Sequence, residues 1–334
     1  MCGKIYFLNN FCIHSAKKIA LTHAMSTTIL ITGSNGLLGQ KLIHGLLMRN
    51  KNGASWNIIA TSKGENRIKE KVGYFYESFD ITSKSEADVL FEKHKPAIVI
   101  NTAAMTNVDA CESNREEAKA LNVTSVENML HAIQNLQSKI EPCFFIQLST
   151  DFVFDGANGP YKEEDLTNPL SYYATTKLDA EKLVEKSNVQ WAILRTIIVY
   201  GVVDGMSRSN IVLWAKEALE KKQKINVVDD QFRSPTLAED LAEACLLCAE
   251  KKAKGIFHVS GKDQMSILEM VYRVADFWKL DKSVITASKS EAIKQPARRP
   301  PRTGFIIEKA KRELGYNPHS FEEGLEILSA QLGV

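Results

Sequence analysis

The sequence lacks a strong excess of charge of either sign. It has 42 lysines and arginines against 40 aspartates and glutamates, so its formal net charge is +2. Proteins that bind nucleic acid or an anionic membrane through charge carry a marked basic excess or stripe, which this balance does not indicate. The chain also lacks an unbroken apolar run of the roughly 20 residues that a membrane-spanning helix needs. We therefore expect no nucleic-acid partner and no membrane span.

Cysteine is scarce and scattered. The six cysteines are Cys2, Cys12, Cys111, Cys143, Cys245 and Cys248. Cys245 and Cys248 lie in an amphipathic stretch, 240–250, where both sulfurs face the apolar side of the expected helix. A zinc or redox site needs a turn or further ligands, and neither is present. We interpret these two as core cysteines, expect no metal site, and take the cysteine usage to indicate a reducing cytoplasm.

Residues 1–26 do not follow the pattern of the rest of the chain. Their apolar segments, Ile5–Leu8 and Phe11–Ile13, are split by two asparagines, and a pair of lysines follows them. A secretory signal has a continuous apolar centre with basic residues before it. We expect a disordered extension, or an upstream start with Met25 as the natural first residue, with a secretory signal as the alternative.

From residue 27 to 200, short β-branched apolar runs alternate with segments of helical periodicity. The expected strands are 28–32, 56–61, 77–81, 97–101, 143–149 and 190–195, and the expected helices are 40–48, 86–95, 116–137 and 172–187. This alternation predicts an α/β protein of Rossmann type, with a doubly wound parallel sheet and helices on both faces. Ligands bind such sheets beyond the carboxyl ends of the strands, where the polar features of this chain also fall. We expect residues 27–200 to form a dinucleotide-binding core.

After residue 200 the alternation loosens. Helices are expected at 210–222 and 266–278, and strands at 225–229 and 255–261. No internal repeat or linker separates an independent domain. We predict that 201–334 form mainly a small C-terminal α/β substrate-binding lobe, with segments near 236–261 returning to the Rossmann core.

A glycine-rich turn joins the first expected strand to the first helix. Glycines at this spacing let the backbone approach a pyrophosphate, and the helix N-terminus behind them stabilises its negative charge. We interpret the turn as a dinucleotide site, the alternative being only a tight strand-to-helix turn. The residues expected to contact the cofactor here are Gly33, Asn35, Gly36, Leu37, Leu38 and Gly39.

The end of the second strand bears on the choice of cofactor. NAD-binding proteins of this kind place an acidic residue there for the ribose 2′-hydroxyl. This chain has Ser62, Lys63 and Arg67, which suit a 2′-phosphate, so NADP(H) is favoured. Glu65 keeps NAD(H) as the alternative cofactor. The basic residues can also be solvated surface charges. Later strand ends add the expected cofactor contacts Asp80, Ile81, Asn101, Ala103, Ala104 and Ser149.

Tyr173 and Lys177 lie four residues apart in an expected helix, so their side chains share one face. A tyrosine has an ordinary pKa of about 10, and we expect the lysine cation to lower it and so tune an acid/base for a carbonyl or an alcohol. Thr150, at a strand end, could hold the reacting oxygen. Tyr173 and Lys177 are also expected to contact the cofactor. A solvated helix face can show the same spacing, but the neighbouring 149–151 segment and the glycine turn favour an active site.

These motifs together resemble the extended short-chain dehydrogenase/reductase superfamily, and within it the dTDP-4-dehydrorhamnose reductase branch. The matching segments are Gly33–Gly39, Ile100–Glu112, Leu148–Gly156, Tyr173–Lys177, Leu194–Thr196, Val199–Gly201, Asp230–Thr236 and Ala297–Pro300. The resemblance implies NAD(P)H-dependent reduction of a 4-keto-6-deoxy sugar linked to a nucleoside diphosphate, with a homodimer left open. It implies a catalytic set of Thr150, Tyr173, Lys177 and Asp151, with sugar contacts at Thr106 and Val108.

Several arginines are candidates for a diphosphate clamp, because guanidinium groups match phosphate oxygens. We expect Arg233 and Arg298 to contact substrate, with Arg299 and Arg302 as further candidates; solvated surface arginines are the alternative. The chain departs from the branch at two positions. Ile198 stands where the resemblance implies a tryptophan packed on the substrate, and Arg233 stands where glycine is more usual.

Two other functions stay open. An epimerase or dehydratase of the same superfamily would keep its cofactor bound without net NADPH use, and Asp151 supplies the acidic residue that dehydratases have beside the strand-end threonine. Relatives of the branch also include regulatory subunits of methionine adenosyltransferase, which bind NADP without evident turnover. The intact catalytic set argues against this last function.

Overall fold

The computed structural model describes residues 26–137, 142–206, 209–293 and 295–333. A parallel seven-stranded sheet with the order β11-β6-β5-β4-β1-β2-β3 forms its centre. The strands are β1 (Thr27–Thr32), β2 (Trp56–Ser62), β3 (Phe75–Ser78), β4 (Ile98–Asn101), β5 (Phe144–Thr150), β6 (Gln190–Thr196) and β11 (Gly255–Val259). The order reverses at β1, so a crevice opens between the carboxyl ends of β1 and β4.

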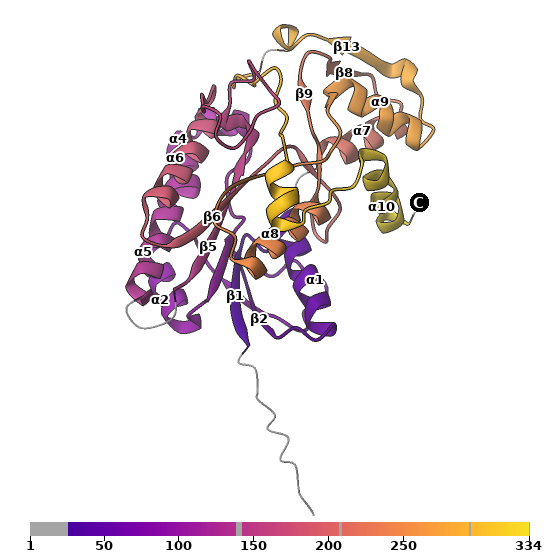
Figure 1. The fold of residues 1–334 in the computed structure, drawn as a ribbon. Coiled ribbons are helices and arrows are strands. Elements are labelled where there is room, and N and C mark those ends of the chain that lie inside the picture. Colours follow the sequence, from indigo (N-terminus) through magenta and orange to yellow (C-terminus); the bar gives the residue numbers. More distant parts are fainter. Residues whose placement is uncertain (1–25, 138–141, 207–208, 294, 334) are drawn as a thin grey trace, which may run out of the picture.

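Helices cover both faces of the sheet (Figure 1). One face carries α1 (Leu37–Lys51) and α8 (Ala238–Lys251), and the other carries α2 (Lys84–His94), α5 (Ser125–Gln137) and α6 (Tyr172–Lys186). Ile29 and Ile31 of β1 pack with the α1 and α8 side chains, whereas Leu30 packs with those of α2 and α5. Because both faces of the sheet are covered, the centres of the inner strands are apolar, as in Ile29–Ile31 and Ile98–Ile100. The predicted doubly wound α/β fold is confirmed.

The long helix predicted for 116–137 is divided in the structure. After α3 (Val108–Ser113) and α4 (Arg115–Lys119), a π-helical turn (Ala120–Thr124) precedes α5. Asn122 in this turn points inward, accepts a hydrogen bond from the Met105 backbone N–H at 2.7 Å, and donates to Thr176 Oγ1 at 3.0 Å. A buried amide needs such partners, which the wider turn lets it reach.

The third strand lies earlier than predicted, at Phe75–Ser78 rather than at 77–81. Asp80 ends the extended run, because its carboxylate accepts hydrogen bonds from both the backbone N–H and the hydroxyl of Thr82. Aspartate favours such local turns over a continued ladder.

The C-terminal lobe lies over the carboxyl ends of the strands, at the upper right of Figure 1. Its helices are α7 (Ile211–Glu220), α9 (Ile267–Phe277) and α10 (Phe321–Leu332), and its strand pairs are β8 (Ile225–Val228) with β13 (Ile285–Ser288) and β9 (Phe232–Arg233) with β12 (Met265–Ser266). The short strands β7 (Val199–Tyr200) and β10 (Thr236–Leu237) pair with each other in parallel. Short helical turns lie at Asp151–Val153, Lys282–Val284, Ser290–Ala292 and Ala310–Leu314. Between β10 and the lobe's later elements, α8 and β11 belong to the main sheet and its cover.

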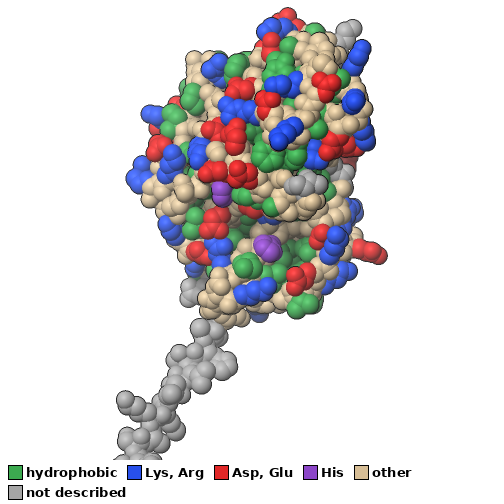
Figure 2. Space-filling model, turned by 90° about the vertical axis from the view of Figure 1, so that its right-hand side faces the viewer, with side chains coloured by type: hydrophobic (Ala, Val, Ile, Leu, Met, Phe, Trp, Pro, Cys, Tyr) green, Lys and Arg blue, Asp and Glu red, His purple; other side chains and the backbone are tan. Residues whose placement is uncertain are grey.

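Lysine, arginine, aspartate and glutamate side chains are interspersed on the face that Figure 2 shows, without a large area of one sign. In the part of the chain that the structure describes, no helix has the length and apolar content required to cross a membrane.

Candidate active site

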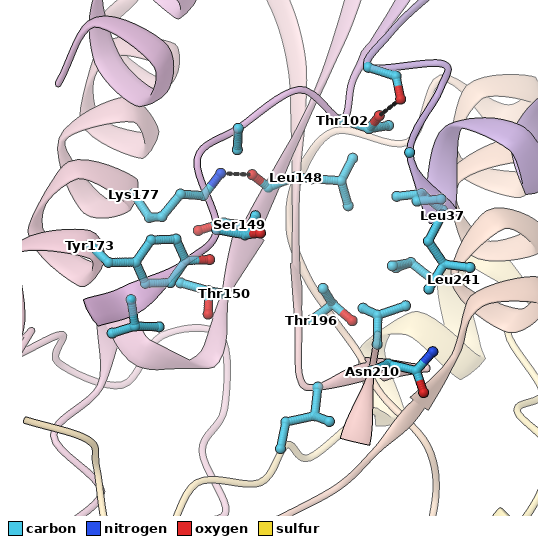
Figure 3. A pocket seen from close by; sticks show the side chains of 18 of the residues that line it. Leu37, Thr102, Leu148, Ser149, Thr150, Tyr173, Lys177, Thr196, Asn210 and Leu241 are labelled. Carbon is cyan, nitrogen blue, oxygen red and sulfur yellow. Dashed lines mark hydrogen bonds between the residues drawn. The ribbon is translucent and has the colours of Figure 1, made fainter. Parts of the chain in front are cut away.

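A cavity of about 640 Å³ opens where the lobe faces the strand ends. Figure 3 shows Tyr173, Lys177 and Thr150 on one side of it, with Leu37 and Leu241 opposite. The main sheet, the α1 N-terminus and the lobe therefore all contribute to its wall.

The glycine turn is shaped by close backbone packing. Gly33 has a φ of +67°, and a Cβ there would lie 2.8 Å from both the Ala103 nitrogen and Thr102 Oγ1. A Cβ on Gly39 would lie 2.4 Å from the Gly33 carbonyl oxygen. Gly36 begins α1 without a side-chain cap, and the first helical turn holds no acidic residue. The positive end of the helix therefore faces the cavity uncompensated, which suits an anionic group such as a pyrophosphate.

A second feature also fits a dinucleotide. Ser149 lines the cavity, and its Oγ is one of the buried side-chain atoms that have no hydrogen-bond partner within the described ranges. A buried hydroxyl without a partner is costly, so it suits a ligand that supplies one. Asn101 is different, since its side chain already bonds Thr32 and Gln147 on the neighbouring strands. Its contribution to the cavity wall is therefore held fixed by the sheet.

The structure brings only some of the expected cofactor residues to this cavity. Those that line it are Gly33, Asn35, Gly36, Leu37, Leu38, Asn101, Ala104, Ser149, Tyr173 and Lys177. Those that do not are Gly39, Ser62, Lys63, Arg67, Asp80, Ile81 and Ala103.

Two of the latter group bind one another. Lys63 Nζ lies 2.6 Å from Asp80 Oδ2, and this contact, with the Thr82 hydroxyl, lowers the pKa of Asp80 to about 2. Asn35 holds the same loop to the glycine turn, because its Oδ1 accepts from the Arg67 N–H at 2.9 Å. Its Nδ2 donates to the Glu65 carbonyl at 2.8 Å. The basic loop after β2 is thus fixed beside the cavity rather than inside it.

The Tyr173/Lys177 pair is buried on the inward face of α6, which begins at the N-cap Ser171. Lys177 Nζ donates to the Leu148 carbonyl at 2.6 Å, as Figure 3 shows. The Tyr173 hydroxyl bonds to Thr150. Burial raises the pKa of Tyr173 well above its ordinary value, and the Thr150 contact only partly opposes this.

The direction of this shift corrects the sequence prediction that Lys177 lowers the pKa of Tyr173. The lysine donates to a carbonyl of β5, and desolvation of the phenolate dominates. A phenol of this kind is fully protonated at neutral pH. It can therefore give a proton to an oxygen that becomes basic during a reaction.

Lys177 carries a testable consequence for stability. Burial lowers its pKa from 10.5 to about 8, although the nearby Glu181 charge opposes the shift. Between these two pKa values the unfolded chain holds a proton that the folded protein does not, so stability rises with pH there. We expect the free energy of unfolding of the natural protein, relative to Lys177→Met, to increase from pH 7.5 to pH 10 in denaturant titrations. A difference that stays constant over this range would contradict the buried-lysine assignment.

Arg233 does not form part of the cavity wall as predicted. It is 1% exposed, and its guanidinium donates to the carbonyls of Pro300 at 2.7 Å and Phe232 at 2.8 Å. Its donors are thus used inside the lobe, which corrects the diphosphate-clamp prediction. Arg298 is exposed and also lies outside the cavity lining, and Arg299 forms an ion pair with Asp109 at 2.7 Å.

The expected sugar contacts Thr106 and Val108 do line the cavity, as do Thr150 and Asp151. Sequence reasoning missed the contribution of the lobe. The additional lining residues include Phe152, Thr196, Val203, Met206, Ser209, Asn210, Ile211 and Leu241. Only Asn210 carried a local signal, since it caps α7 by accepting a hydrogen bond from the Leu213 N–H at 3.2 Å.

Ile198 also lines the cavity, with a φ of +30°. A β-branched side chain is strained at such a backbone angle. The Thr236 N–H donates to the Ile198 carbonyl at 3.1 Å and helps to hold this conformation between β6 and β7. Ile198, which stands where the reductase branch is expected to have tryptophan, is thus held in place at the cavity wall.

This fold and this arrangement of strand-end threonine, helical tyrosine and lysine define an extended short-chain dehydrogenase/reductase, in its dTDP-4-dehydrorhamnose reductase-like branch. The chain belongs to the RmlD substrate binding domain family, whose model matches residues 27–333.

Individual relatives carry different names. Methionine adenosyltransferase 2 subunit beta of Xenopus laevis is 31% identical over 273 residues, which cover 80% of this chain and 77% of that protein. A dTDP-4-dehydrorhamnose reductase structure from Clostridium acetobutylicum is 27% identical with a TM-score of 0.77, covering 92% of this chain and 100% of that one. The corresponding Bacillus anthracis reductase in complex with NADP is 25% identical with a TM-score of 0.78, at the same coverage.

Proposed function

We propose that the protein is an NADPH-dependent reductase of a nucleotide-linked 4-keto-6-deoxy sugar. The observation that carries this proposal is the meeting of Thr150, Tyr173 and Lys177 with the glycine turn in one cavity. The bound cofactor would supply the hydride that reduces the C4 carbonyl. The Clostridium acetobutylicum and Bacillus anthracis reductases among the structural relatives support the choice of substrate class.

The side chains of this protein would supply the proton and the orientation. Tyr173, protonated because it is buried, would donate its phenolic proton to the C4 oxygen as that oxygen gains charge. Lys177, whose Nζ is held at the cavity wall by the Leu148 carbonyl, would contact the nicotinamide ribose of the bound cofactor. Thr150, bonded to the Tyr173 hydroxyl, would hold the phenolic oxygen close to the C4 oxygen of the sugar.

The direct test is a panel of nucleotide 4-keto-6-deoxy sugars with NADPH, followed by the loss of NADPH absorbance. We expect turnover with at least one dTDP- or UDP-linked sugar and none with the corresponding 4-hydroxy sugar. Absence of NADPH oxidation with every keto sugar, by a protein that binds NADPH, would overturn the proposal.

The basic loop after β2 supports NADP(H) as the cofactor, with NAD(H) the alternative. We predict that Arg67→Ala weakens NADPH binding at least tenfold and leaves NADH binding within about twofold, because a charge-assisted hydrogen bond contributes roughly 1.5–3 kcal/mol. Binding is measured by cofactor fluorescence. Lys71→Ala, at an exposed position a few residues away, is the matched control. Equal weakening of NADPH and NADH binding would contradict the proposal that Arg67 contacts the 2′-phosphate.

A second function is favoured by the methionine adenosyltransferase subunit beta relatives. On this proposal the chain would bind NADP and associate with the catalytic chain of a methionine adenosyltransferase without reducing a sugar. Mixing the purified protein with that synthetase from the same source discriminates the two. A stable complex together with no turnover on the sugar panel favours the regulatory function, and turnover without a complex favours the reductase.

A further inference from the structure

Asp151, which sequence reasoning placed among the catalytic residues, is engaged on both of its carboxylate oxygens. Oδ1 accepts a hydrogen bond from Thr150 Oγ1 at 3.2 Å. Oδ2 accepts one from Thr303 Oγ1 and lies 3.7 Å from Arg233 Nε. The side chains of Asp151 and Arg233 are 3% and 1% exposed. Asp151 is thus a buried acceptor with its partners already in place.

These partners come from three separate parts of the chain. Asp151 follows β5, Arg233 ends β9 in the lobe, and Thr303 belongs to a segment, 300–303, that we call the strap. The strap pairs with β9, since the Phe232 N–H donates to the Pro301 carbonyl at 2.8 Å and the Thr303 N–H to the Phe232 carbonyl at 3.1 Å. Arg233 reinforces this through the Pro300 carbonyl at 2.7 Å. One carboxylate and one guanidinium therefore join the catalytic strand end to the lobe.

The charges explain why the contact is specific. A buried ion is costly unless it is paired and hydrogen-bonded. Burial raises the pKa of Asp151 and lowers that of Arg233, and each partner opposes this shift in the other. Thr150 Oγ1 is the donor in its bond to Asp151 Oδ1. The Asp151 carboxyl group thereby fixes the rotation of the Thr150 hydroxyl and takes its single proton, so the Tyr173 hydroxyl is the donor in its bond to Thr150.

We propose that Asp151 and Arg233 are positioning residues, which together lock the strap and lobe onto the strand end and orient Thr150 beside Tyr173. Asp151 then does not donate a proton to substrate, and elimination of water, which needs an acid beside the strand-end threonine, is not an activity of this site. This inference rests on the proposed reductase function for its kinetic part, whereas the ion pair itself can be tested without turnover.

The test is a cycle of Asp151→Asn, Arg233→Met and the double variant. Each single change leaves one buried charge unpaired, and we expect it to lower the midpoint of thermal unfolding by roughly 10 °C. The double variant should regain at least half of that loss. Arg312→Met, which replaces an exposed arginine, controls for the loss of an arginine. Its midpoint of thermal unfolding should stay near that of the natural protein. Additive losses in the double variant would overturn the pairing.

The kinetic part separates positioning from proton donation. We expect Asp151→Asn to lower kcat for the keto sugar at least tenfold and to raise the primary isotope effect from deuterated NADPH, because a misplaced Thr150 slows the chemical step. The double variant should recover at least a third of the natural kcat. A double variant that is stable but as inactive as Asp151→Asn would show that the carboxyl itself is required and overturn the positioning role.

The outcomes for the two proposals are separable. If the natural protein reduces no keto sugar, the proposed function fails, while the unfolding midpoints still decide whether Asp151 and Arg233 act as a pair. If the single variants do not fold, the double variant alone carries the kinetic comparison.

Discussion

We expect Tyr173→Phe to lower kcat/KM for the keto sugar by about 10²–10⁴-fold and to leave NADPH binding unchanged. The variant removes only the hydroxyl that bonds to Thr150 and would donate the proton. The ring stays packed edge-on against Phe152, with 6.2 Å between ring centroids, so the fold is retained. Steady-state rates and cofactor fluorescence measure the two quantities separately.

The adjacent tyrosine supplies a matched control. Tyr172 is half-buried and its ring lies under the Arg115 guanidinium, outside the residues that line the cavity. We expect Tyr172→Phe to keep turnover within about twofold, because Tyr172 does not line the cavity. Equal rates in the Tyr173→Phe variant and the natural protein would remove the tyrosine from the mechanism.

Arg195→Met should lower the free energy of unfolding by about 3–5 kcal/mol, which is the usual cost of leaving one member of a buried ion pair without its partner. Arg195 contacts Glu181 at 2.7 Å through Nη2 and at 3.0 Å through Nε, and the side chains are 4% and 2% exposed. Glu181 lies one helical turn beyond Lys177 on α6. The pair therefore anchors the helix that carries the candidate acid/base residues, and denaturant unfolding measures its contribution.

The double variant Glu181→Met/Arg195→Met checks the cause of this loss. It removes both charges and leaves apolar side chains of similar length, so most of the stability should return. A double variant that is no more stable than Arg195→Met would mean that lost packing, and not the unpaired carboxylate, accounts for the effect.

The parts of the fold and of the site that the sequence predicted depend on local physics. The glycine turn could be identified because only glycine fits at Gly33 and Gly39, between backbone atoms of neighbouring loops. Tyr173 and Lys177 could be paired because helical spacing alone puts them on one face. The inner strands of the sheet were recognisable because burial on both faces makes their central residues apolar.

The parts that it did not predict depend on contacts between distant segments. Nothing local in the sequence shows that Arg233 reaches the strap and Asp151 rather than a diphosphate, since the guanidinium chemistry suits both. The direction of the Tyr173 pKa shift likewise depends on how completely the fold buries it. Residues 1–25, expected to be an extension, lie outside the described residues.

The most direct test of the account is the fate of the transferred hydrogen. NADPH carrying deuterium at both C4 positions of the nicotinamide ring is incubated with the dTDP-linked 4-keto-6-deoxy sugar and the natural protein, and the product is examined by NMR and mass spectrometry. The account predicts one deuterium at C4 of the sugar and a hydroxyl in place of the carbonyl. A product without deuterium, or a substrate returned unchanged while the cofactor stays bound and unoxidised, would contradict it.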